Sequence, residues 1–133
     1  MSDYTPVFLP GDVIPLTTSG IVAGGDLVEV SGSGTVAKVG TTASAKYVGI
    51  AEQDAVSGAR VGVFARDLVH ESVADGAITA GDQITTTSTA ARQVKTVPAV
   101  TTPTPADVTN TRGIIGVALT TVADNQKVRW MQY

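Results

Sequence analysis

The sequence predicts an all-β protein: a small β-barrel or sandwich built from two repeated strand–hairpin–strand units, with an extended N-terminal arm. Valine occurs 20 times and threonine 19 times, whereas leucine occurs only five times. These β-branched side chains are stiff at χ1 and fit a pleated surface. Fourteen glycines and six prolines divide the chain into short segments. No window longer than about eight residues has a clean helical period.

Short segments with strand composition follow one another along the whole chain. Their ranges are 11–16, 26–31, 35–40, 45–53, 60–65, 66–73, 83–88, 91–97, 112–120 and 127–133. The turn "SGSG" joins the second and third segments, which predicts a hairpin. Pro15 places the first segment at a sheet edge or a bulge. Gly49, inside the fourth, indicates a bulge or a close backbone approach.

The chain repeats itself at a distance of about half its length. The stretch "GIVAGGDLVEV" at 20–30 matches "GAITAGDQITT" at 76–86, and "YVGIAEQDAVSGARVGVF" at 47–64 matches "IIGVALTTVADNQKVRWM" at 114–131. The spacing between matching residues is larger in the second match because the second copy carries an insertion. We therefore expect a single β domain over 11–133, with pseudo-repeats at about 20–65 and 76–132 and a long Pro/Thr-rich loop at 97–111. The two copies are expected to close on each other, which hides the exposed strand edges.

The first ten residues have a different character from the rest of the chain. Two prolines within five residues predict an extended segment, and ten extended residues reach at most roughly 35 Å. We expect an arm at 1–10 that contacts a neighbouring subunit or another partner. Its candidate contact residues are Tyr4, Pro6, Val7, Phe8 and Leu9.

Composition excludes several classes of partner. The formal net charge is −3 and no Lys/Arg cluster occurs, so the electrostatic footprint of a nucleic-acid-binding protein is missing. No apolar run approaches the ~20 residues of a membrane span. The N-terminus "MSDYTPVFLP" lacks the basic and apolar regions of a signal peptide. Charged residues make up only 16% of the chain, below the usual ~25%, which suggests that a partner covers part of the surface.

The sequence offers no catalytic, cofactor-binding or metal-binding set of residues. There is no cysteine, and His70 is the only histidine, so a metal site has no ligand cluster to draw on. A lone histidine in a strand is usually a surface or hydrogen-bonded residue. The glycine-rich stretch 31–34 is followed by neither a helix nor a lysine, as a phosphate loop would be. We predict that the protein is not an enzyme.

Gly-Asp pairs recur just before predicted strands. They are Gly11–Asp12, Gly25–Asp26 and Gly81–Asp82. Glycine accepts the positive φ of a turn, and the following aspartate can bond the amides of that turn. We interpret all three pairs as structural turns. A catalytic pair of aspartates is the alternative interpretation.

The C-terminal strand carries the only tryptophan. Trp130 matches Val63 of the first repeat, which predicts a core-facing side chain. The alternative is a subunit interface formed by Trp130, Met131 and Tyr133, because aromatic residues and methionine are enriched in interfaces.

The order of these motifs resembles that of a known family. An opening "PGDVIPLT", then "AGGDLVEV", a hairpin, "VGIAE", a second "ITAGDQI" and a closing "IGVAL" before the last strand look like the small capsid cement, or head decoration, proteins of tailed bacteriophages. The resemblance covers nearly the whole chain, and its strength lies in the order of the motifs.

This resemblance implies a structural role on the outside of a phage head. Such proteins clamp neighbouring major capsid subunits, commonly as homotrimers, so the implied partners are the major capsid protein and further copies of this chain. The implied location is the outer surface of the virion capsid, after synthesis in the host bacterial cytoplasm. Another virion component, such as a head fibre base or a tail protein, is the second interpretation. A small ligand-binding or hydrolytic β-barrel is the third.

Overall fold

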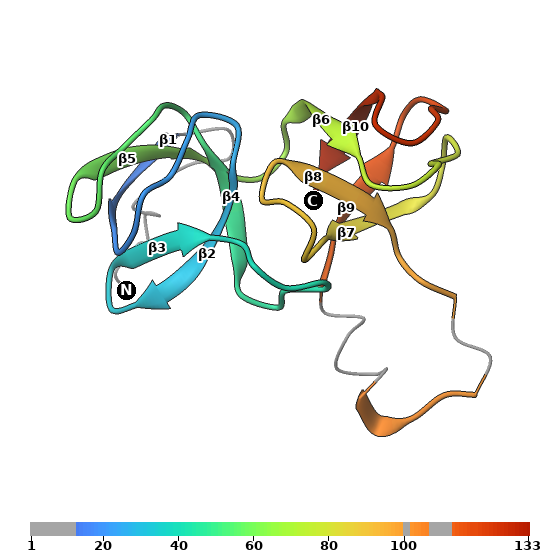
Figure 1. Ribbon diagram of the computed structural model, residues 1–133, viewed down its shortest axis with the longest axis horizontal. Coiled ribbons are helices and arrows are strands. Elements are labelled where there is room, and N and C mark those ends of the chain that lie inside the picture. Colours follow the sequence, from blue (N-terminus) through green and yellow to red (C-terminus); the bar gives the residue numbers. More distant parts are fainter. Residues whose placement is uncertain (1–12, 100–101, 107–112) are drawn as a thin grey trace, which may run out of the picture.

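The computed structural model describes residues 13–99, 102–106 and 113–133, and shows two small β-barrels lying side by side (Figure 1). The first barrel contains β1 (Val13–Thr18), β2 (Leu27–Gly32), β3 (Thr35–Lys38), β4 (Tyr47–Ala51) and β5 (Arg60–Phe64). The second contains β6 (Val69–Ala74), β7 (Gln83–Thr86), β8 (Gln93–Thr96), β9 (Ile114–Ala118) and β10 (Lys127–Gln132). The predicted all-β class, built from two repeated units, is confirmed.

Both barrels have the same strand order. The first closes in the order β1-β3-β2-β4-β5, and the second in the equivalent order β6-β8-β7-β9-β10. In each, the first strand runs parallel to the third and antiparallel to the fifth, and all other neighbours are antiparallel. The isolated bridges also correspond, because Val22 pairs with Ala55 and Ile78 pairs with Val122.

The expectation that the two repeats close on each other is wrong, because each repeat closes on itself. The strand that closes each ring lies before the repeat found in the sequence. It is β1 in the first barrel and β6 in the second. Their sequences, "VIPLTT" and "VHESVA", have little in common, so the structural repeat is longer than the sequence repeat. Five strands per unit suffice to remove the free edges that a four-stranded unit would leave.

Pro15 lies in the part of β1 that has a partner on one side only. Its register partner is Gly62 of β5, whereas β3 pairs only with Thr17 and Thr18 at the other end of β1. The missing N–H of proline therefore costs no bond to β3. This is the edge position that the sequence predicts.

The apolar core has two parts. The first barrel is filled by the buried cluster Val22, Val28, Val36, Ala51, Val61 and Val63. A larger cluster fills the second barrel and continues into the first, where it includes Leu27, Val39 and Ile50, each at most 5% exposed. These three residues are therefore buried by the packing of one barrel against the other.

Residues 102–106 of the long β8–β9 loop lie away from both barrels (Figure 1). Thr102, Pro103, Thr104, Pro105 and Ala106 are exposed, and Pro105 and Ala106 have helical conformation. The shorter β3–β4 loop of the first barrel instead packs against the second barrel, to which it is hydrogen-bonded.

Candidate functional site

The two described Gly-Asp pairs form the same turn, once in each barrel. Gly25 and Gly81 have φ values of 93° and 94°. The Asp26 carboxylate accepts a hydrogen bond from the backbone N of Ala23 (2.9 Å), and the Asp82 carboxylate accepts one from Thr79 (3.0 Å). Each carboxylate thus serves the turn of its own barrel. Gly11 and Asp12 lie outside the described residues.

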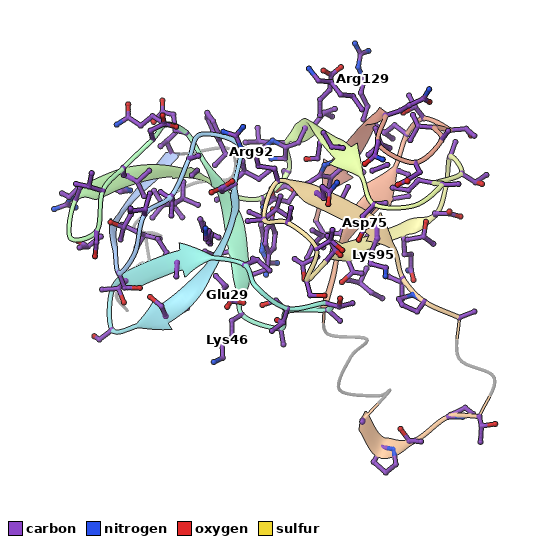
Figure 2. The ribbon with its side chains drawn as sticks, viewed as in Figure 1. Glu29, Lys46, Asp75, Arg92, Lys95 and Arg129 are labelled. Atoms are coloured by element: carbon purple, nitrogen blue, oxygen red, sulfur yellow. The ribbon has the colours of Figure 1, made fainter. Side chains whose placement is uncertain are left out.

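Asp26 has a second role that Asp82 lacks. Arg92, from the loop between β7 and β8, places its Nε 3.3 Å from Asp26 and donates a hydrogen bond to the carbonyl of Gly24 (2.8 Å). Figure 2 shows Arg92 at the boundary of the two barrels. Asp82 instead accepts a hydrogen bond from Thr96 of its own barrel. The first turn is therefore part of the contact between barrels, which we call the junction.

The β3–β4 loop supplies most of the other polar contacts of the junction. The backbone N of Ser44 donates to the Thr86 hydroxyl (2.9 Å), which itself donates to the carbonyl of Thr41 (2.9 Å). The backbone N of Ser88 is bonded to Thr42. At Gly113 an added Cβ would lie only 2.5 Å from the backbone of Ala43, so a side chain there would clash with the loop.

A buried amide joins the two barrels beside this loop. The Gln132 side-chain oxygen accepts a hydrogen bond from the Tyr47 hydroxyl (3.1 Å) and lies 2.9 Å from Nε2 of His70. Burial raises the pKa of the Tyr47 phenol, so it remains a neutral donor. Burial also lowers the pKa of His70, and the bond to Gln132 opposes this only in part. The neutral imidazole then carries its hydrogen on Nε2.

The candidate residues of the C-terminal strand separate into one buried and two exposed side chains. Trp130 is 0% exposed and its indole N–H donates to the Ser72 hydroxyl (3.0 Å), so its side chain belongs to the core. Met131 and Tyr133 are 40% and 47% exposed. Only these two are available to a partner.

Two surface features of the first barrel are open. A hollow of about 520 Å³ is lined by Val30, Ser31, Gly32, Ala45, Lys46, Tyr47 and Val48. A smaller apolar depression contains the exposed side chains of Ile21 and Val56.

The predicted sites do not come together into one site. Asp26 and Asp82 serve separate turns in separate barrels, and the arm residues Tyr4, Pro6, Val7, Phe8 and Leu9 lie outside the described residues. No group of three or more His, Cys, Asp or Glu side chains in the described ranges is placed to hold a metal ion. Within the same ranges, no helix has the length and apolarity to cross a membrane.

Sequence reasoning missed the residues of the junction. The junction pairs lie far apart in the chain. Arg92 and Asp26 are separated by 66 positions, and Tyr47 and Gln132 by 85. No local motif marks them. One signal was available. In the last strand exposed and buried residues alternate, and Gln132 occupies a position on the buried side.

Comparison with known proteins gives a likeness of fold. No family model matches the sequence, and no curated protein matches it. Among solved structures, the N base of the head fibre protein gp8.5 of bacteriophage phi29 matches with a TM-score of 0.58. The match has 15% sequence identity and covers 91% of this chain and 92% of that chain. The two proteins share a fold over nearly their whole lengths.

Proposed function

We propose that the protein is a structural component of a bacteriophage virion, attached to the outside of the head, where its two barrels form an attachment base. The observation that carries this proposal is the shared fold with the head fibre base over 91% of the chain. A match of this extent includes both barrels, so the likeness is to the tandem arrangement and goes beyond a single small barrel. The motif order in the sequence supports the same location by a separate route.

The detailed role that we favour is that of a base, from which a fibre or another appendage extends. The clamping role of a cement protein is the second candidate, and the resemblance of the motif order to head decoration proteins supports it. In both roles the expected partner is the major capsid protein, and the expected oligomer is a homotrimer. Neither role involves catalysis or a cofactor.

We further propose that the N-terminal arm contributes to attachment. Its residues Tyr4, Pro6, Val7, Phe8 and Leu9 combine apolar side chains with two backbone-restricting prolines. Such a segment can add a strand to an exposed sheet edge of the capsid, with pockets for Val7 and Leu9. An extended arm held by proline loses little conformational entropy on binding.

The test is a binding assay with purified phage heads that lack the protein. Full-length protein should bind the outer surface at a fixed number of sites, seen as added density by electron cryo-microscopy. Heads that bind no protein would overturn the proposal. A protein lacking residues 2–9 should keep its fold, by circular dichroism, and lose most of its occupancy. Full occupancy of this truncated form would exclude the role of the arm.

The same heads distinguish the base from the cement protein. A cement protein raises the temperature at which heads break open, because it links neighbouring capsid subunits. A base occupies its sites without changing that temperature. Comparing heat disruption of decorated and undecorated heads therefore separates the two candidates.

A further inference from the structure

The repeated architecture means that each surface of one barrel has an equivalent on the other. The junction uses one face of the first barrel and a different face of the second. The equivalent faces have no partner among the residues that the structure describes.

The face that the first barrel gives to the junction is called the donor face. It consists of Leu27, Val39 and Ile50, which the second barrel buries, and of the loop 41–44. Phe64, the register partner of Ile50, continues this face and contacts the ring of His70, with ring centroids 6.3 Å apart.

The face of the second barrel that receives it is called the acceptor face. Its main residues are Thr86 at the end of β7, Ser88 just beyond, and Gly113 just before β9. These groups bond or closely contact the loop 41–44. The acceptor face thus lies between the end of β7 and the start of β9.

The equivalent region of the first barrel is a hollow that no described residue fills. The residues at the positions of Thr86, Ser88 and Gly113 are Val30, Gly32 and Lys46. All three line the hollow of about 520 Å³ described above. Val30 is 43% exposed, although it occupies a strand that is otherwise well packed at its start.

The second barrel has an uncovered donor face. Val97 and Val117 occupy the positions of Val39 and Ile50, and they are half-buried where their equivalents are buried. Met131, at the position of Phe64, is exposed, and it is the register partner of Val117. The β8–β9 connection follows Val97 in the chain as the loop 41–44 follows Val39, and its residues 102–106 are exposed.

We propose that the donor face of the second barrel binds the acceptor hollow of the first barrel in another copy of this chain. The contact repeats between chains the packing that already exists within one chain. It brings the apolar side chains of Val117 and Met131 against Val30 and its neighbours. Because the two faces differ, the contact is head-to-tail and generates a ring or an open filament.

Three differences make this contact weaker than the junction. Gly34 lies near the position of Arg92, so the ion pair to Asp26 has no counterpart. Gln83 replaces Leu27, which makes the second donor face more polar, as is usual for surfaces that associate reversibly. Lys46 replaces Gly113, where a side chain would clash with the loop 41–44 in the junction, so the arriving chain cannot approach the first barrel as closely. The Lys46 side chain points away from the first barrel (Figure 2).

The experiment measures self-association of the full chain in solution by sedimentation velocity. The wild-type protein should form species heavier than the monomer as its concentration rises to about 200 µM, a range that detects weak contacts. Val30→Glu places a charge in the acceptor hollow, and Met131→Glu places one on the donor face. Each should lower the association constant at least tenfold. Ile21→Glu is the control, because this exposed residue lies outside both faces.

Mixing the two defective variants tests the head-to-tail geometry directly. Val30→Glu retains an intact donor face and Met131→Glu an intact acceptor hollow, so an equimolar mixture should form a dimer and no larger species. A wild-type protein that stays monomeric throughout would overturn the proposal. So would a mixture that fails to dimerise, or an Ile21→Glu variant that dissociates as fully as the other two.

The variants are compared only if their circular dichroism spectra match the wild type. Val30→Lys and Met131→Lys replace either variant that does not fold. The proposal does not rest on attachment to a phage head, and the assay contains no heads. Its failure would therefore leave the binding assay described above unaffected, and the reverse is also true.

Discussion

Gly116 of β9 lies so close to β10 that a Cβ atom at residue 116 would be 2.2 Å from the carbonyl oxygen of Met131. Gly49 stands in the same relation to Phe64 in the first barrel, at 2.1 Å. In both barrels a register shift occurs opposite this glycine. The predicted bulge and close backbone approach at Gly49 are confirmed, and Gly116 repeats them.

We expect Gly116→Ala to destabilise the protein by about 1–3 kcal/mol, because the added methyl group forces two paired strands apart. Gly49→Ala should cost a similar amount. Gly20→Ala is the matched control, since a Cβ there has no atom within 4 Å. Its effect should stay within about 0.5 kcal/mol. Urea unfolding followed by circular dichroism measures all three, and equal stability of Gly116→Ala and wild type would contradict the packing described here.

The bond between Trp130 and Ser72 predicts a second loss of stability. Ser72→Ala removes the acceptor of a buried indole N–H, which should cost about 1–3 kcal/mol. Ser57→Ala, at an exposed position, is the control and should change the free energy of unfolding by less than about 0.5 kcal/mol. The double variant Trp130→Phe with Ser72→Ala should lose less than the sum of the two single variants, because both partners are then absent. Strict additivity would show that the bond contributes nothing.

The sequence was sufficient to predict the class, the strands and the turns of this fold. Each of the ten strands in the described residues overlaps a predicted segment, because β-branched residues between glycine-rich turns leave few alternatives. The turns at Gly25 and Gly81 have a local sequence signal. A glycine, which accepts the positive φ of the turn, is followed by an aspartate, whose short side chain accepts a hydrogen bond.

What the sequence did not reveal depends on contacts between distant residues. The strands β1 and β6 close their rings although their sequences differ, because a barrel strand needs matching backbone bonds and only a loose pattern of side chains. The junction depends on pairs such as Asp26 with Arg92 and Ser44 with Thr86, which are far apart in the chain. Periodicity and local motifs carry no information about such pairs.

Asp26 provides a test of how much the junction depends on its ion pair. Asp26→Asn retains an oxygen that accepts the bond from Ala23 but removes the charge facing Arg92. Because the Arg92 side chain is 58% exposed, we expect a coupling of only about 0.2–1 kcal/mol in a double-mutant cycle with Arg92→Gln. Asp82→Asn with the same Arg92→Gln change should show no coupling. The cycle is measured by urea unfolding at low and at high salt, and the Asp26 coupling should fall as salt rises.

His70 predicts a loss of stability in mild acid. Burial lowers its pKa in the folded protein below the ordinary value of 6.5, so the unfolded chain binds the proton more tightly than the folded one does. Above pH 6.5, therefore, His70 should not make the free energy of unfolding depend on pH. It should then fall as the pH drops from 6.5 through the folded pKa, with a slope of at most about 1.4 kcal/mol per pH unit. The carboxyl groups of Glu71 and Asp75 also have lowered pKa values in the folded protein. Their contribution to stability is lost only at lower pH, as the pH falls below their ordinary pKa values of 4.5 and 3.8.

Because His70 is the only histidine, its titration can be followed as a single imidazole signal by NMR. The measured pKa should lie below 6.5. His70→Phe keeps a ring beside Trp130 and Phe64 but cannot take up a proton, so it should remove the slope between pH 6.5 and the folded pKa of the wild-type histidine. A pKa at or above 6.5, or an unchanged slope in His70→Phe, would show that the burial of this residue does not lower the stability of the protein in mild acid.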